Sequence, residues 1–502
     1  MGHLIGWGLD QATDDHRTRK AQQLVDDALE KVRQPLTVAV ITFFEQPLSP
    51  TSLMTLEVAL LGLVRLIGRH LLESVLNACE PAQPHLLPNS VWFECGGYRR
   101  RNEKTARRNV ASRFGDLVLN RRGYRSWQSG DGSIFPLEML LGLNHSATPA
   151  LVDWIGRNMA VAGSNQAAVI ALLRTACGVT MGVKRLRGCV HQLSESMAEL
   201  RQAHQVDELL RALSEAAKST GSRKPVLAVG RDGITLREYK HRFFEVATAA
   251  TVSVYDRAGK RLTTVYLAWP PELGQATMDR MLTELLTELF DRFAGPLPRL
   301  AYVTDSGSNE TSYYRQVLRP MVHPRTGKRL DWVRVADYYH ASERIWTMAD
   351  TLFGKGTKEA HGWATRMLKS LKKPSGTSRV LHSAASHFHR RKLSKPKQED
   401  FWKAYRYIQS RTRHMRYSEY ASVHIPLGSG VTEAACKTIF TQRLKNSGMR
   451  WSHEGAKAIL TLRTILLSKT WSCTFADCLK ISYPSDLRPY MTNACQQTKI
   501  AA

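Results

Sequence analysis

The stretches PVLAVGRDGITL (residues 225–236) and RLAYVTDSGS (residues 299–308) decide the fold of this chain. In each stretch a short apolar run bounded by turn residues predicts a buried strand, and an aspartate follows the run, Asp232 in the first and Asp305 in the second. Burying a carboxylate costs free energy unless it is paired or binds a cation, so both aspartates are candidates for chemistry. The Ser-Gly-Ser after Asp305 leaves room for a phosphate or a metal ion near the backbone.

The segments around these two strands set the order of the elements. Residues 245–270 predict two strands joined by a tight turn, and residues 278–293 have helical periodicity. Residues 310–318 are expected to be helical, and DWVRVADYYH (residues 331–340) predicts a strand that runs into a helix. Three antiparallel strands followed by alternating strands and helices are the order of an RNase H-like core.

In an RNase H-like core the first and fourth strands are neighbours, which would place Asp232 beside Asp305. A third acid, Glu433, opens a predicted helix after Gly428-Ser-Gly430. Capping a helix is the simpler interpretation of Asp305 or Glu433 taken alone, because acids favour helix N-termini. Together, on these elements and in this order, the three acids predict a site for two Mg²⁺ ions, or Mn²⁺ in their place, roughly 4 Å apart.

The charge balance points to a polyanionic partner. The chain of 502 residues has 71 Lys plus Arg against 44 Asp plus Glu, a net charge of +27. Such an excess destabilises the compact state unless a polyanion binds, and nucleic acid is the expected partner. A membrane surface is the alternative, but no lipidation motif supports it. The apolar segment 53–76 carries five ionisable side chains, from which we expect an amphipathic helix and no membrane span.

The cysteine pattern and the N-terminus bear on the compartment. The eight cysteines form no CxxC pair, so we expect reduced, mostly buried thiols in a cytosolic protein. MGHLIGWGLDQATDD lacks the basic region and apolar run of a signal peptide.

The sequence predicts a multidomain α+β protein with five regions. Residues 1–95 are expected to be helical, with an apolar stripe that faces the core or, alternatively, a dimer interface. Residues 96–220 are a basic DNA-binding region, residues 221–340 the first part of the core, and residues 426–502 its completion. Residues 341–425 predict a basic helical insertion, since positions 341–420 alone hold 18 Lys plus Arg against 6 Asp plus Glu.

Two segments of the 96–220 region are candidates for contact with DNA. The first is an arginine-rich stretch next to aromatic residues, with a strand expected from Asn109 to Leu119 and a turn at residues 121–123; a solvated basic face is the alternative. The second, residues 167–190, has a helix, a break at Gly178 and a basic helix, the outline of a helix-turn-helix. The candidate DNA-binding residues are Arg99, Arg100, Arg101, Arg107, Arg108, Arg121, Arg122, Lys184, Arg185 and Arg187.

The motifs VTDSGS, ADYYH and GSGVTEAACKTIFTQRLKNSGMRW resemble those of the DDE transposases of bacterial insertion sequences, specifically the ISKra group. The resemblance extends over residues 96–470 and is strongest over 226–340 and 425–470. It implies that Asp232, Asp305 and Glu433 are the DDE triad and that the basic insertion is the one typical of such enzymes. Many members carry paired cysteines near the basic strand, where this chain has Cys95 alone.

Asp337 and His340 match the C/D-x-x-H signature that this group shares with related transposases. His340 is a candidate for contacting the scissile phosphate or orienting water, with a hydrogen-bonded structural histidine as the alternative. Asp337 is expected to support the metal ligands and not to be one of them. Five residues after Glu433 are candidates for DNA contact, with a solvated helix face or core packing as alternatives: Lys437, Arg443, Lys445, Arg450 and Trp451.

The function expected from the sequence is that of a DNA transposase. It would act in the bacterial cytoplasm at the nucleoid, bind double-stranded DNA as a homo-oligomer such as a dimer, and cut and join strands at one two-metal site. The first alternative is an RNase H-like nuclease or resolvase that hydrolyses DNA without joining strands. The second is a transposase-derived protein that binds DNA and has lost catalysis.

Overall fold

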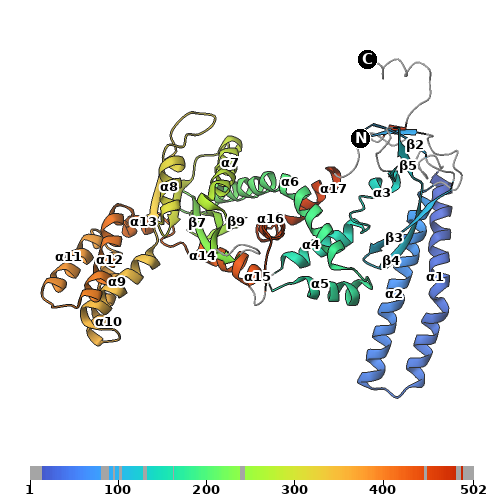
Figure 1. Cartoon of the computed structure of the whole chain (residues 1–502), viewed down its shortest axis with the longest axis horizontal. Coiled ribbons are helices and arrows are strands. Elements are labelled where there is room, and N and C mark those ends of the chain that lie inside the picture. Colours follow the sequence, from blue (N-terminus) through green and yellow to red (C-terminus); the bar gives the residue numbers. More distant parts are fainter. Residues whose placement is uncertain are drawn as a thin grey trace, which may run out of the picture. The chain divides into compact units, whose positions relative to one another are not determined.

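The computed structural model describes residues 14–80, 90–93, 96–100, 104–127, 133–161, 163–237, 244–445, 449–481 and 488–489 (Figure 1). The chain is a mixed α+β protein that divides into two compact units. We call residues 1–159, 164–196 and 475–502 the N-terminal unit, and residues 160–163 and 197–474 the C-terminal unit. The division falls inside the long helix α6 (Val183–Lys218).

The C-terminal unit is built on a five-stranded sheet of order β11-β10-β7-β8-β9. The strands β7 (Val226–Arg237), β8 (Phe244–Tyr255) and β9 (Arg261–Trp269) pair antiparallel in sequence order. The strand β10 (Arg299–Thr304) lies parallel to β7, and β11 (Trp332–Ala336) lies parallel to β10. The predicted adjacency of the first and fourth strands of this region is therefore confirmed.

The alternation of side chains along β7 and β10 divides the core between the two faces of the sheet. Leu227, Val229 and Tyr302 belong to a cluster with α7 (Ala276–Arg292) and the second half of α6. Their neighbours Ala228 and Val303 belong to a second cluster with α9 (Tyr338–Phe353) and the helices that follow it. Because side chains two residues apart share a face, Asp232 and Asp305 continue the second face.

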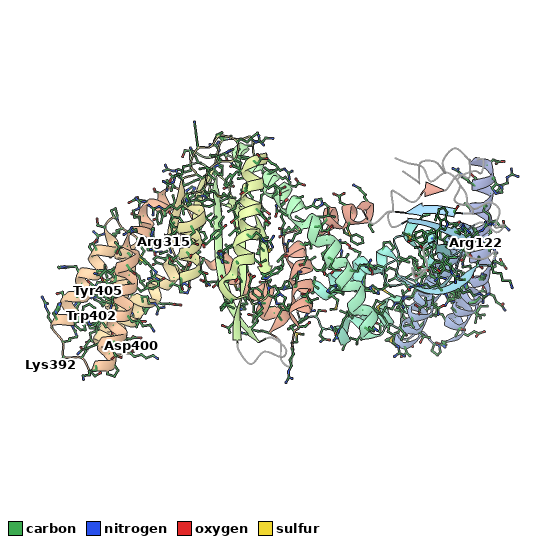
Figure 2. All side chains as sticks on the ribbon, turned by 45° about the horizontal axis from the view of Figure 1, so that its top comes forward. Arg122, Arg315, Lys392, Asp400, Trp402 and Tyr405 are labelled. Carbon is green, nitrogen blue, oxygen red and sulfur yellow. The ribbon has the colours of Figure 1, made fainter. Side chains whose placement is uncertain are left out.

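The predicted insertion is helical, as expected. It consists of α9, α10 (Lys358–Leu371), α11 (Gly376–His389), α12 (Lys395–Arg411) and α13 (Tyr417–Ser422), which gather to one side of the sheet, at the left of Figure 1. Trp363 and Phe401 are buried inside it, so its aromatic residues build its core. Figure 2 shows Lys392, Asp400, Trp402 and Tyr405 at the end of the insertion remote from the sheet.

Short helices connect and complete the sheet. The segment after β10 forms α8 (Ser308–Tyr313) and η5 (Tyr314–Leu318). After the insertion come α14 (Gly430–Cys436), η7 (Lys437–Thr441), α15 (Gln442–Leu444), α16 (His453–Leu467) and α17 (Trp471–Ile481). Of these, α16 packs against β9, and α14 packs against β7 and β8.

The N-terminal unit begins with a long helical hairpin of α1 (Asp14–Glu45) and α2 (Pro50–Ala78) (Figure 1). A small sheet of order β12-β1-β2-β5-β6 contains Arg488–Pro489, Ser90–Phe93, Gly96–Arg100, Tyr124–Ser126 and Ser133–Ile134. The helices α3 (Pro136–Leu140), α4 (Pro149–Ala160) and α5 (Gln166–Leu172) follow, and η3 (Leu173–Cys177) continues α5. The break at Gly178 before α6 confirms the predicted helix, turn and helix as local structure.

Two predictions for this unit are wrong in detail. Residues 90–93 form the strand β1, so the region 1–95 is not helical throughout. The single strand expected from Asn109 to Leu119 is a hairpin of β3 (Ala106–Ser112) and β4 (Gly115–Arg121). The alternating pattern continues through the two-residue turn, and Gly115, the first residue after the turn, has φ of 113°, a conformation that favours glycine.

The apolar stripe of α2 is half-buried, and the exposed apolar side chains of this helix, such as Leu53 and Leu61, lie outside the stripe. Among the described residues of the α1–α2 hairpin, Ala28, Val32 and Ser52 are buried, whereas the stripe residues such as Leu60 and Leu63 are half-exposed. By length and composition α2 could cross a membrane, so the charges in segment 53–76 do not exclude a span as the sequence argument supposed. One such helix does not establish a membrane location.

Candidate active site

The helix that carries Glu433 sits directly on the sheet face that carries Asp232. The hydroxyl oxygens of Thr432 on α14 and Thr251 on β8 are 2.7 Å apart. A Cβ atom on Gly230 would lie 2.0 Å from the Thr432 hydroxyl oxygen, so only glycine fits there. This close approach brings Glu433 to the middle of β7, where Asp232 lies.

The three predicted acids are close enough for their charges to interact. Burial raises the pKa of Asp232 above its usual range, and the neighbouring charges of Asp305 and Glu433 raise it further. Two donors offset part of this cost, because the Gly233 amide donates to Asp232 Oδ1 over 2.8 Å and the Cys436 thiol also donates to this carboxylate. Half-buried carboxylates that repel one another are stabilised by a cation, which is the arrangement expected of a metal site.

A second group of side chains meets at Glu433. The Asp337 carboxylate is fully buried and accepts hydrogen bonds from the His340 amide (2.8 Å) and from the Ser429 amide and hydroxyl (2.6 Å for the hydroxyl). The Ser429 hydroxyl is also 2.8 Å from Glu433 Oε1. His340 Nδ1 lies 3.5 Å from Asp337 Oδ1 and 3.7 Å from Glu433 Oε1. One serine and one histidine therefore link Asp337 to Glu433.

The protonation states of this group follow from its contacts. The Asp337 carboxylate, 3.5 Å from Nδ1, raises the pKa of His340 to about 9, against the opposing effect of burial. Hydrogen bonds from His340 and Ser429 outweigh the desolvation of Asp337 and lower its pKa to about 2. At neutral pH this pair is therefore an imidazolium and a carboxylate. Asp337 therefore contacts His340 and Ser429, and Ser429 links it to Glu433.

The donor atoms can be compared with what a metal ion requires. Among the described residues, ligand atoms of Asp337, His340 and Glu433 come within 4.8 Å of one another. A protonated imidazole is not a ligand, and a metal ion would have to displace its proton. Asp232, Asp305 and Glu433 offer carboxylate oxygens alone, which are the ligands that Mg²⁺ and Mn²⁺ prefer. The donor set of the three acids therefore fits Mg²⁺ better.

The insertion holds the turn that carries Asp305. The Tyr407 hydroxyl on α12 donates to the Asp305 carbonyl over 2.9 Å, and Arg411 Nη2 donates to the Ser306 carbonyl over 2.9 Å. Ser306 has φ of 64°, a left-handed conformation that costs energy in a non-glycine residue and needs such support. The insertion therefore contributes directly to the geometry of the acid cluster.

Several residues of the site were not singled out from the sequence. Ser429 and Cys436 bond to the carboxylates. Tyr407 bonds to the Asp305 carbonyl, and Arg411 bonds to the neighbouring Ser306 carbonyl. Glu310 on α8 is buried, with 8% of its surface exposed. Burial is the main cause that raises its pKa, and the charges of Asp305 and Asp232 raise it further. Only Ser429 had a sequence signal, its place in the Gly-Ser-Gly before Glu433.

The predicted DNA-binding residues of the N-terminal unit differ in exposure. Arg99, Arg107 and Lys184 are exposed, and Arg100 is partly exposed. Three others make contacts within the unit: Arg108 donates to Ser146, Arg185 to the carbonyls of His145 and Ser146, and Arg187 to Gln166. Arg121 and Arg122 are buried, Arg121 in an ion pair with Glu138, so neither is presented to a DNA surface here. Arg101 lies outside the described residues.

The candidates after Glu433 divide in the same way. Lys437, Lys445 and Arg450 are exposed. Arg443 is fully buried, and its guanidinium carbon lies 5.0 Å from the centre of the Trp451 ring. Trp451 Nε1 donates to the Leu444 carbonyl over 3.1 Å. The side chains of Arg443 and Trp451 therefore pack against each other inside the protein.

No protein-family model matches the chain, and no curated protein is similar to it.

Proposed function

We propose that this protein is a DNA transposase of the DDE type, with an RNase H-like catalytic core in its C-terminal unit. The observation that carries the proposal is that Asp232, Asp305 and Glu433 lie near enough on the same face of the sheet for the charges of the other two to raise the pKa of Asp232. Two come from neighbouring parallel strands, and the third comes from a helix seated on the same face. The strand order and this placement are those that the RNase H-like interpretation requires.

Charge and motif content support DNA as the substrate. The net charge is +27, and the insertion that touches Asp305 has a large share of it. The motif from Gly428 to Trp451 resembles that of the bacterial insertion-sequence enzymes. Exposed basic residues on both units, such as Arg107 and Lys437, are available to contact phosphates.

The reaction is an in-line displacement at phosphorus, performed twice. In cleavage, water forms the new bond to phosphorus and the 3′-oxygen leaves; in joining, that 3′-hydroxyl attacks a phosphodiester of the target and displaces its 3′-oxygen. Mg²⁺ ions held by Asp232, Asp305 and Glu433 would supply charge stabilisation to the attacking and leaving oxygens. The chain itself orients the acids, through Ser429 at Glu433 and Tyr407 at the Asp305 backbone.

The proposal is tested with labelled duplex DNA that carries the inverted repeats flanking the coding gene. Wild type is compared with Asp232→Asn, Asp305→Asn and Glu433→Gln in Mg²⁺ and Mn²⁺. We expect each variant to bind the DNA and to leave it uncut, whereas wild type nicks it at the repeat and joins the freed end to a second duplex.

The same assay separates the alternatives. Cleavage without joined products would identify a nuclease or resolvase. Binding of the repeats by all four proteins without cleavage would identify a DNA-binding protein that has lost catalysis. Equal cleavage by wild type and the three variants would show that these acids do not form the site.

A further inference from the structure

Arg344 lies beside the acid cluster. It is on α9, one helical turn after His340, so the two side chains share a face of the helix. Its guanidinium carbon lies 5.2 Å from the centre of the Tyr407 ring. The hydroxyl of the same ring donates to the Asp305 carbonyl over 2.9 Å. One aromatic ring therefore connects Arg344 to the backbone of a proposed metal ligand.

The two arginines that contact this ring differ in what they bind. Arg411, whose guanidinium carbon is 4.0 Å from the ring centre, donates to the carbonyls of Ser306 and Tyr407. Arg344 makes no hydrogen bond and no ion pair with any residue in the described part of the chain. The Nε atoms of both arginines are buried without a hydrogen-bond partner, so the two differ in their Nη atoms, which are bonded in Arg411 and unbonded in Arg344. Because the Arg344 side chain is partly exposed, its unbonded Nη donors can bind an acceptor from outside the chain.

We propose that Arg344 binds a phosphate of the DNA strand next to the cleaved bond, and that Tyr407 holds its guanidinium in place. This inference rests on the proposed function. A guanidinium is a planar fork of donors that matches two phosphate oxygens, and stacking on an aromatic ring preorganises it. A DNA strand is favoured over a free phosphate because the insertion around Arg344 is strongly basic.

A matched pair of variants isolates the contact. Arg344→Ala removes the free guanidinium, and Arg406→Ala removes an exposed arginine next to Tyr407 on α12. Both lower the net charge by the same amount, so a general loss of attraction for DNA would affect them alike. We expect Arg344→Ala to weaken DNA binding or cleavage by roughly 10- to 100-fold, the range for one hydrogen-bonded charged group, and Arg406→Ala to have a small effect. Arg344→Lys should lose less binding than Arg344→Ala, because lysine keeps the positive charge but lacks the planar pair of N–H donors.

The phosphate partner is found by replacing single phosphates near the repeat end with uncharged methylphosphonates. At the contacted position the replacement should weaken binding by wild type and by Arg406→Ala, and should cause little further loss with Arg344→Ala. Additive losses at every position would overturn the proposal. So would an Arg344→Ala variant that binds all the duplexes as tightly as wild type.

The readouts separate this inference from the proposed function and from a purely structural role. Binding is measured by fluorescence anisotropy in Ca²⁺, so Arg344 can be judged even if wild type fails to cut DNA. Thermal unfolding of the unbound variants is measured in parallel. If Arg344→Ala unfolds at a markedly lower temperature and Arg344→Lys does not recover the methylphosphonate effect, the residue is structural and the inference fails.

Discussion

The sheet of the C-terminal unit and the α1–α2 hairpin both carry long apolar runs, but they bury them to different extents. Strands β7 and β10 place apolar side chains on both faces, and helices cover each face. The hairpin is fixed at its base by polar contacts, such as Asn77 with Val118 and Asn120, and by Arg65 with the Thr175 carbonyl. Towards its tip it leaves apolar side chains exposed: Val38, Val40, Ile41, Phe44, Leu48, Leu53, Met54, Val58, Leu61 and Val64.

The difference shows that apolar periodicity establishes a helix but not its partner. In the sheet, the covering elements are in the same chain and close by in sequence. In the hairpin, the pattern is equally regular, yet two helices alone cannot surround their own apolar faces. Substitutions of apolar residues should therefore lower the free energy of unfolding strongly in the sheet and weakly in the hairpin.

The largest expected effect is on activity, at Asp305, directly after the interior strand β10. Asp305→Asn should lower DNA cleavage by roughly 10³-fold or more, as is typical when a residue of a catalytic unit is removed. Its thermal stability without metal should be unchanged or higher, because one of three repelling carboxylates becomes neutral. Cleavage assays and thermal unfolding of the same preparation measure both. A destabilised variant would indicate that Asp305 supports the fold and not a metal.

The next largest effect is on stability, and it compares a buried leucine of the sheet region with an exposed leucine of the hairpin. Leu286 on α7 is fully buried against the sheet. Leu286→Ala should lower the free energy of unfolding of the protein by about 2–5 kcal/mol. Leu61 is 54% exposed on α2, and the same change there should cost less than about 0.5 kcal/mol. Urea unfolding at several protein concentrations measures both. A large cost at Leu61 that grows with concentration would show that self-association covers the hairpin in solution.

A smaller loss is expected at Asp337, where the buried carboxylate joins α9 to the segment before α14. Asp337→Asn should cost about 1.5–3 kcal/mol, because hydrogen bonds to a charged acceptor are replaced by weaker ones. The folded-state pKa is about 2, below the usual 3.8, so the stability from the charge is present above pH 3.8 and is lost as the pH falls towards 2. The gap between wild type and variant, measured by unfolding at pH 7 and pH 3, should therefore narrow at low pH. A gap that widens in acid would contradict the assigned ionisation.

The same contrast shows how far the sequence could lead. The strand order and the places of Asp232 and Asp305 could be predicted, because each follows an apolar run whose length and neighbours specify a strand. The exposure of apolar side chains beside the predicted stripe, such as Leu53 and Leu61, could not be predicted, because an apolar residue in a helix looks alike whether or not a partner covers it. Arg121 and Arg443 looked like surface charges but are buried against Glu138 and Trp451, contacts that depend on tertiary packing. The contact of Tyr407 with Asp305 joins residues 102 positions apart, and no local pattern encodes it.

The smallest effect tests that contact. Tyr407→Phe removes the hydroxyl that donates to the Asp305 carbonyl but keeps the ring under Arg344 and Arg411. Tyr405→Phe is the matched control, because the Tyr405 hydroxyl has no partner among the described residues while its ring packs on Phe401 and Trp402. One neutral hydrogen bond contributes about 0.5–1.5 kcal/mol, so cleavage by Tyr407→Phe should fall by roughly 2- to 10-fold at saturating DNA. The loss should lie in kcat, with DNA affinity unchanged, because the hydroxyl orients the turn that carries Asp305. Equal rates for the two variants would mean that Arg411 and the strand end hold this turn without help from the tyrosine.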